Sequence, residues 1–142
     1  MRRRNLKWLV LLLLLGALGW AYTAWPVLND VETGRTPQYP ELQPRSYAAP
    51  PEQVVAAVKD ALGSLPRWRL VGSGSGPGGA RLEAVHTTLV WRFEDDVTVK
   101  VTREAGRTRV SVRSKSRVGR ADFGQNARNI RELLAALDGR VR

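Results

Sequence analysis

The first 25 residues constrain the chain most, because they contain 18 successive uncharged residues, WLVLLLLLGALGWAYTAW, at positions 8–25. An apolar run of this length predicts a transmembrane helix. Tryptophan at both ends of the run, Trp8 and Trp25, resembles the aromatic belts that flank membrane-spanning helices. The small residues Gly19 and Ala21 would also permit cleavage by signal peptidase. Residues 1–25 are therefore predicted to be a transmembrane signal anchor or, alternatively, a signal peptide.

The charges before this run predict its orientation. Arg2, Arg3, Arg4 and Lys7 precede it, and the positive-inside rule therefore leaves the N-terminus in the cytoplasm. The chain after Pro26 is expected on the far side of the inner (cytoplasmic) membrane, in the periplasm or another extracytoplasmic space. The sequence contains no cysteine, which excludes disulfides, a thiolate nucleophile and thiolate metal ligands but does not indicate a compartment.

Residues 26–50 are predicted to be a Pro-rich tether, because five prolines in this segment disfavour both helix and central strand. A flexible tether of this length would hold the domain roughly 25–30 Å from the membrane, and a fully extended one about 80 Å. Tyr39, Leu42 and Tyr47 indicate that the later half of the tether packs on the domain.

Residues 51–142 are predicted to form a small α+β domain. The helix expected at 51–63 has Pro51 and Glu52 in its first turn, where both are favoured. Strands are expected at 67–71, at 80–93 as one long strand or two, at 96–103 and at 107–116. The sequence GSGSGPGG at 72–79 matches the dinucleotide pattern G-x-G-x-x-G, but strand-like sequence follows it, so we expect a hairpin and no cofactor there.

The last two strands alternate in polarity and are predicted to form an antiparallel hairpin with one buried and one wet face. Valines occupy the buried face, at Val97, Val99, Val101, Val110 and Val112. A final helix is expected after the capping residue Asp122, with Gln125 in capping-box spacing. Its apolar face is predicted to contain Phe123, Ala127, Ile130, Leu134 and Leu137. The predicted fold class is α+β, with an N-terminal transmembrane helix, then a helix, about four antiparallel strands and a C-terminal helix packed on the sheet.

Basic residues provide the candidate binding surface. The chain has 23 Lys+Arg against 13 Asp+Glu and a formal net charge of +10. The outward strand face and the turn after it carry the candidates, which are Arg109, Arg113, Lys115, Arg117 and Arg120. Arginine matches phosphate and carboxylate groups well, so this surface fits an anionic lipid, an envelope polymer or a partner protein. Structural ion pairs are the alternative interpretation of the same residues.

The most distinctive stretch of the domain is Arg113–Leu134, RSKSRVGRADFGQNARNIRELL, together with Phe93-Glu94-Asp95-Asp96-Val97. These segments resemble the domain-of-unknown-function family 1499, and the resemblance covers roughly two thirds of the chain, from about Tyr39 to Leu137. The resemblance implies a small α+β domain, often on membrane or exported proteins of bacteria and photosynthetic organelles, with no established activity. The motif residues interpreted as architecture are Asp95, Asp96, Ser114, Ser116, Gly119, Asp122, Gly124, Asn126 and Arg131.

Catalytic groups are scarce in this sequence. Asp95 and Asp96 are adjacent, so on a regular strand their side chains point to opposite faces. We expect Asp96 to pair with an arginine and Asp95 to be a turn residue. His86 is the only histidine, and neither a base for the serines nor a metal-ligand cluster is evident. An enzyme is therefore not favoured.

Three functional hypotheses remain open. The first is a membrane-anchored extracytoplasmic binding or envelope-interaction module with a basic surface. The second is a small-ligand or hydrolytic site built from Asp95, Asp96, Arg113 and Asn126, which requires these side chains to converge on an open pocket. The third is a scaffold for oligomeric assembly, which requires an exposed apolar patch. Nucleic acid is not expected as a partner, because the domain would lie across the membrane from the chromosome.

Overall fold

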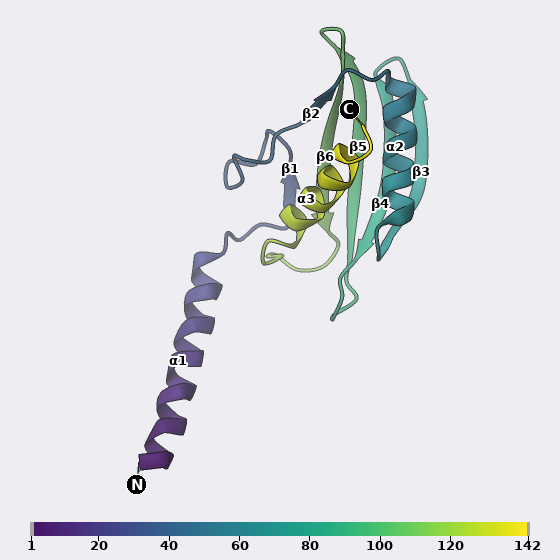
Figure 1. Cartoon of the computed structure of the whole chain (residues 1–142). Coiled ribbons are helices and arrows are strands. Elements are labelled where there is room, and N and C mark those ends of the chain that lie inside the picture. The colour runs from purple at the N-terminus through teal and green to yellow at the C-terminus, as the bar shows by residue number, and fades with distance from the viewer. Residues whose placement is uncertain (1, 142) are drawn as a thin grey trace.

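The uncharged run lies within one continuous helix, α1 (Arg2–Ala24), which projects from the rest of the molecule (Figure 1). This computed structural model describes residues 2–141, with side chains from Leu6 to Val141. The segment Leu6–Ala24 is 19 residues long, has a mean hydropathy of 1.6 and is not buried by the domain. It would span about 28 Å, close to the thickness of the hydrocarbon core of a bilayer. This helix is thus long and apolar enough to cross a membrane, a property that signal sequences share.

Six antiparallel strands form a single sheet, in the order β1-β6-β5-β4-β3, with β2 also paired to β6. Their bounds are β1 (Asp30–Glu32), β2 (Arg45–Tyr47), β3 (Trp68–Gly76), β4 (Gly79–Thr87), β5 (Glu94–Glu104) and β6 (Arg107–Ser116). The predicted α+β class is confirmed, and β3 to β6 are the four predicted strands. The glycine-rich segment does form a hairpin, but β3 runs through its first half to Gly76 and only residues 77–78 make the turn.

The two additional strands come from the segment predicted to be a tether. β1 and β2 pair with the same edge of β6, at residues 113–115 and 108–110. The prolines of the segment lie outside both strands, in positions where no ladder N–H is needed. Tyr39, Leu42 and Tyr47 pack against the core, as predicted. Only Trp25–Leu28 therefore separate α1 from the residues bound to the sheet, which corresponds to at most about 14 Å of chain.

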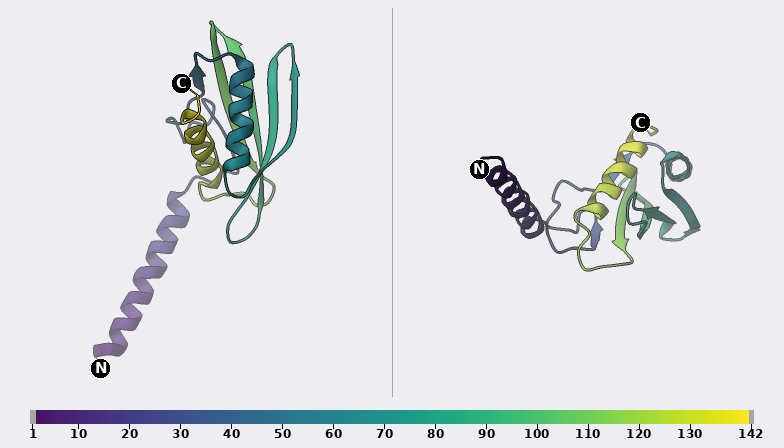
Figure 2. Two further views of the ribbon diagram at one scale, coloured as in Figure 1. Left: turned by 45° about the vertical axis from the view of Figure 1, so that its right-hand side comes forward. Right: turned by 90° about the horizontal axis from the view of Figure 1, so that it is seen from below.

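The helices α2 (Pro51–Ser64) and α3 (Gln125–Asp138) cover one face of the sheet, so the domain has two layers (Figure 2). Both helices are amphipathic, and their apolar stripes meet the valines of β5 and β6, all five of which are fully buried. The predicted helix face is confirmed from Ala127 to Leu137. Phe123 is the exception: it precedes the helix, has a φ of 50° and is 51 % exposed.

The pairing register places distinct loops at the two ends of the sheet. At one end His86 pairs with Asp95 and Asp95 with Ser116. The 88–93 loop, the 117–124 loop, the start of α3 and the junction with α1 all lie there (Figure 1). We call this the α1 end. The hairpin turns at 77–78 and 105–106 lie at the opposite end.

The packing of β1 makes a prediction about stability. Val31 is fully buried, so Val31→Ala should lower the free energy of unfolding of the domain by about 1–3 kcal/mol. Denaturation of the full chain in detergent, followed by the circular dichroism of its secondary structure, measures this change. Val27→Ala removes the same atoms from a side chain that is 73 % exposed, and should change it by less than about 0.5 kcal/mol. Equal effects of the two variants would contradict the role of β1 in the fold.

Candidate functional site

A closed network of polar side chains lies between α3 and the α1 end of β5 and β6. Asn129 Nδ2 donates hydrogen bonds to Asp95 Oδ2 at 2.8 Å and to Ser114 Oγ at 3.1 Å. Ser114 Oγ donates in turn to Asn126 Oδ1 at 2.6 Å. All four residues are buried. Their hydrogen bonds satisfy one another across the helix–sheet junction, as buried polar groups require.

Asn126 extends this network to the chain segment that leaves α1. Its Nδ2 donates to Ser116 Oγ at 2.8 Å and to the carbonyl of Asn29 at 3.1 Å. The carbonyl of Asn29 also accepts from the N–H of Ser116 at 2.8 Å. One amide therefore connects α3, β6 and the residue that precedes β1.

Asp95 is deeply buried rather than the turn residue that was predicted. His86 Nδ1 lies 3.5 Å from Asp95 Oδ2, at the limit of hydrogen-bond distance, and both side chains are almost inaccessible to solvent. Burial by itself would raise the pKa of the Asp95 carboxyl, but the nearby polar groups of His86, Asn129 and Ser116 outweigh burial and hold the pKa below its usual value. Asp95 is thus held as a carboxylate inside the fold.

The four residues of the predicted ligand or hydrolytic site do not converge. Asp95 and Asn126 lie on the helix-covered face, whereas Asp96 and Arg113 lie on the open face. Asp96 Oδ1 accepts from Arg117 Nη2 at 2.7 Å, as the predicted arginine pairing requires. Within residues 6–141, no group of three His, Asp or Glu side chains could hold a metal ion. The arrangement is that of a structural junction.

Acidic neighbours pair most of the predicted basic surface. Arg113 Nε lies 2.8 Å from Asp30 Oδ1, and this hydrogen bond raises the pKa of the guanidinium and lowers that of the carboxyl. Arg109 Nη1 lies 3.1 Å from Glu104, and Arg117 binds both Glu94 and Asp96. Arg131, a motif residue, pairs with Glu41 and lies over the ring of Tyr39. Among the described residues, Lys115 and Arg120 are the two candidates that have no carboxylate within 4.0 Å.

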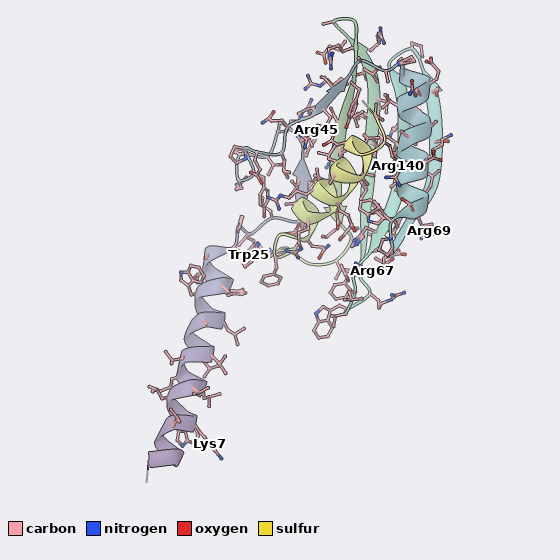
Figure 3. All side chains as sticks on the ribbon, in the orientation of Figure 1. Lys7, Trp25, Arg45, Arg67, Arg69 and Arg140 are labelled. Atoms are coloured by element: carbon pink, nitrogen blue, oxygen red, sulfur yellow. The ribbon has the colours of Figure 1, made fainter. Side chains whose placement is uncertain are left out.

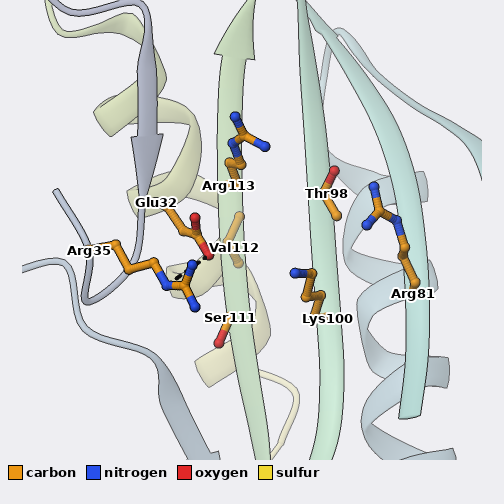
Figure 4. Close-up of a pocket in the computed structure, with 8 residues that line it drawn as sticks. All are labelled: Glu32, Arg35, Arg81, Thr98, Lys100, Ser111, Val112 and Arg113. Carbon is orange, nitrogen blue, oxygen red and sulfur yellow. Dashed lines mark ion pairs between the residues drawn. The ribbon is translucent and has the colours of Figure 1, made fainter. Parts of the chain in front are cut away.

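A shallow groove of about 140 Å³ crosses the open face of the sheet (Figure 4). Its lining residues are Glu32, Arg35, Arg81, Thr98, Lys100, Ser111, Val112 and Arg113. Arg35 pairs with Glu32 and Arg81 with Glu83, so charges of both signs border the groove. The face predicted to be wet is therefore polar and open, but it is not a purely cationic surface.

A larger and more apolar pocket lies at the α1 end, between the 88–93 and 117–124 loops. Its volume is about 430 Å³. Apolar side chains line most of it, namely Leu89, Val90, Trp91, Phe93, Val118, Ala121 and Phe123. Asp95, Ser116, Asp122, Gln125 and Arg128 supply the polar part of the wall. We call this the loop pocket.

Local hydrogen bonds hold the first loop in shape. The N–H of Thr88 donates to the carbonyl of Phe93 at 2.8 Å, and the N–H of Phe93 donates to Thr88 Oγ1 at 2.9 Å. Arg92 completes the turn with a φ of 57°. This loop was predicted to be strand. Three successive apolar residues, Leu89-Val90-Trp91, after the break at Thr87-Thr88 were the signal against that interpretation, since a half-buried strand alternates.

The second loop contacts both α1 and the segment that follows it. Tyr22 packs against Phe123, with ring centroids 6.4 Å apart. Trp25, labelled in Figure 3 where α1 meets the domain, packs against Gly124, whose added Cβ would lie 2.7 Å from the indole nitrogen. Asn29 Nδ2 donates to the carbonyl of Gly119 at 2.8 Å. Gly119 and Gly124 have φ of 87° and 77°, a conformation that favours glycine.

The hydrogen bonds that Asp122 accepts account for its presence in the motif. Its two carboxylate oxygens accept from the N–H groups of Gly124 and Asn126, both at 2.8 Å. Asp122 therefore satisfies an N–H group in the first turn of α3, as predicted of a capping residue, although the N-cap position itself is Gly124. The capping box itself does not form, because Gln125 Nε2 donates to Asn129 Oδ1 at 2.8 Å instead of reaching back.

Comparison with known proteins identifies the family. The family model described as "Protein of unknown function (DUF1499)" matches residues 23–137. The chain belongs to this family. The match confirms the resemblance seen in the motif residues, and it includes the junction after α1, both loops of the α1 end and nearly all of α3. Because this family is described as being of unknown function, membership does not assign an activity to the chain.

More distant likeness adds no functional information. The chain is similar to the Thermus thermophilus protein TTHA0849, whose crystal structure is known, at 16 % identity and a TM-score of 0.39. That similarity covers 78 % of this chain and 95 % of the other. No curated protein matches the sequence.

The buried network makes a prediction about acid stability. Asn129→Leu removes donors from Asp95 and Ser114 and should lower the free energy of unfolding at pH 7 by about 1–3 kcal/mol. Because the pKa of Asp95 is depressed in the folded state, Asp95 stabilises the fold above its unfolded pKa of about 4, and that contribution is lost as pH falls further. Asn129→Leu should therefore also weaken the dependence of stability on pH below about 4.

The matched control is Asp96→Asn, which changes the adjacent, exposed carboxylate on the opposite face. Asp96→Asn should lower the free energy of unfolding by less than about 1 kcal/mol, because exposed ion pairs contribute little to stability. Denaturant unfolding at a series of pH values measures both variants. A loss in Asn129→Leu no larger than that in Asp96→Asn would contradict the structural role of the network.

Proposed function

We propose that this chain is a single-pass membrane protein whose small domain binds an apolar or amphipathic molecule in the loop pocket. In this proposal α1 is retained as a signal anchor, with its N-terminus in the cytoplasm and the domain in the periplasm or another extracytoplasmic space. The observation that carries the proposal is the loop pocket itself, an apolar cavity of about 430 Å³ beside the point where α1 meets the domain.

The size and composition of the loop pocket support a binding role. Pockets for small molecules and cofactors have volumes of about 300–1,000 Å³, and apolar walls with a few polar groups are typical of them. Here the apolar wall comes from two loops, and the polar groups, among them Ser116 and Asp95, lie at the ends of β6 and β5. The buried network behind them is fully cross-linked by hydrogen bonds, so it supports the floor of the pocket rather than offering a reactive group.

The charge distribution favours this pocket over the basic surface as the binding site. Arg109, Arg113 and Arg117 have carboxylate partners within the domain, and an anionic partner would have to compete with those pairs. The open-face groove is also about a third of the volume of the loop pocket. An anionic group on the ligand is compatible with the pocket, since Arg128 lies in its wall.

The proposed topology predicts the outcome of surface labelling. The chain lacks cysteine, so Gly78→Cys, at an exposed turn where an added Cβ meets nothing within 4 Å, creates a single reporter. A membrane-impermeant maleimide should modify this cysteine in intact cells or spheroplasts, and the mass of the membrane-bound product should equal the full chain plus one label. The matched reporter Lys7→Cys should remain unmodified until the membrane is opened. A shorter mass, cut near Gly19 or Ala21, would overturn the retained anchor.

The proposed pocket predicts the outcome of photolabelling. A diazirine-bearing palmitic acid, added to the full chain in nanodiscs, should label residues 88–93 and 117–125. The labelling should saturate with probe concentration, and an excess of unlabelled palmitate should prevent it. Ala121→Trp places an indole in the pocket and should remove most of the saturable labelling, as peptide mass spectrometry would measure. Ala56→Trp, on the exposed face of α2, should leave it unchanged. Labelling that does not saturate, or that is equal in both variants, would contradict a binding pocket.

A further inference from the structure

Exposed apolar side chains concentrate at the α1 end of the domain. Among the side chains described from residue 25 to residue 141, ten large apolar residues are exposed, and only Leu70 and Val71 lie elsewhere, on β3. The other eight are Trp25, Val27, Leu89, Val90, Trp91, Phe93, Val118 and Phe123. We call these eight residues the apolar rim. Six of the eight, all except Trp25 and Val27, line the loop pocket and so lie together. Soluble domains rarely leave such a group of apolar side chains in water without a partner.

The apolar rim lies close to the end of the segment that can cross a membrane. That segment ends at Ala24, and the rim begins with the next residue, Trp25. By Asn29 the chain is bonded to Gly119 and Ser116. The intervening residues are themselves held, since the carbonyl of Leu28 accepts from the N–H of Asp122 at 2.9 Å. The domain is therefore fixed to the end of α1 and cannot move far from it.

The direction of the loops is also defined. The 88–93 loop extends from the same end of the sheet as α1. In Figure 1 and in the left view of Figure 2, both point downward from the domain. The hairpin turns at 77–78 and 105–106 point the opposite way. A membrane that encloses α1 up to Ala24 would thus meet the 88–93 loop first.

The chemistry of the rim matches the interfacial layer of a bilayer. Trp91, at the tip of the loop, is 75 % exposed, and tryptophan is enriched at the level of lipid headgroups. Arg92 beside it and Arg120 in the second loop have no carboxylate within 4.0 Å in residues 6–141, so both are available to phosphate groups. The acidic residues of this end have partners within the domain. Glu94 pairs with Arg69 and Arg117, and Asp96 pairs with Arg117. Asp122 accepts hydrogen bonds from the N–H groups of Gly124 and Asn126.

From these observations we infer that the apolar rim docks onto the bilayer that α1 spans, with the tip of the 88–93 loop inserted among the lipid headgroups and upper acyl chains. The inference rests on the retained α1 of the proposed function, but not on what the loop pocket binds. It gives the loop pocket a mouth at the lipid surface, so that an amphipathic ligand enters from the leaflet.

Spin-label depth measurements on the full chain in nanodiscs test this inference. Val90→Cys, on a side chain that is 73 % exposed, and Gly78→Cys each receive a nitroxide. The label at 90 should be accessible to oxygen and largely shielded from a water-soluble nickel chelate, whereas the label at 78 should be open to the chelate. Equal access of the chelate to both labels would overturn docking. Dipolar broadening at position 90 that disappears on dilution with unlabelled chain would show that a second copy, not lipid, covers the rim.

Three variants separate docking from its alternatives. Trp91→Asp combined with the label at 90 should restore access of the chelate, whereas Leu70→Asp, which places the same charge on β3, should not. Ala121→Trp fills the loop pocket and leaves the rim apolar, so the label at 90 should keep its depth. If the chain without Ala121→Trp shows saturable photolabelling but the label at 90 is open to the chelate, docking is wrong and the binding pocket stands. If the label at 90 is shielded but photolabelling does not saturate, the binding pocket is wrong and docking stands.

Discussion

The hydrogen bonds of one buried amide hold together the parts of the chain that define this domain. Asn126 lies in the first turn of α3 and bonds to Ser114 and Ser116 of β6 and to the carbonyl of Asn29. Asn126 and Ser114 are fully buried and Asn29 and Ser116 are partly buried, so leaving the Asn126 amide unpaired would cost about 1–3 kcal/mol. The position of α3 on the sheet and the path of the chain out of α1 are therefore coupled, and the loop between β6 and α3 is fixed by both.

This coupling gives the motif residues a shared explanation. Ser114 and Ser116 of β6 lie on the same face as Val110 and Val112, so they enter the helix-covered layer where hydroxyl groups need partners. Asp122 and the glycines at 119 and 124 shape the turn that delivers Asn126 to them. The serine, aspartate and asparagine residues of this motif are types that also occur in catalytic sites. In this domain their hydrogen bonds join helix α3 to strand β6.

The sequence predicts those parts of the fold that depend on local periodicity. The valines of β5 and β6 alternate without interruption, and α3 repeats its apolar residues at helical spacing, so both elements were correctly predicted. β1 and β2 are three residues each, too short for a periodic signal, and they exist only because β6 offers a free edge. The burial of Asp95 depends on His86 and Asn129, which are distant in sequence. The loop pocket likewise forms from two loops whose proximity only the register of the sheet reveals.

The short junction after α1 restricts where this protein can act. With α1 in a bilayer, the four junction residues and their hydrogen bonds keep the domain next to the membrane. The domain can then contact only molecules in a layer that is little deeper than its own diameter. Its encounters then occur by lateral diffusion in two dimensions, and a weak intrinsic affinity for a molecule in the same leaflet suffices because the local concentration of that molecule is high. Molecules dissolved in the surrounding compartment have no such advantage.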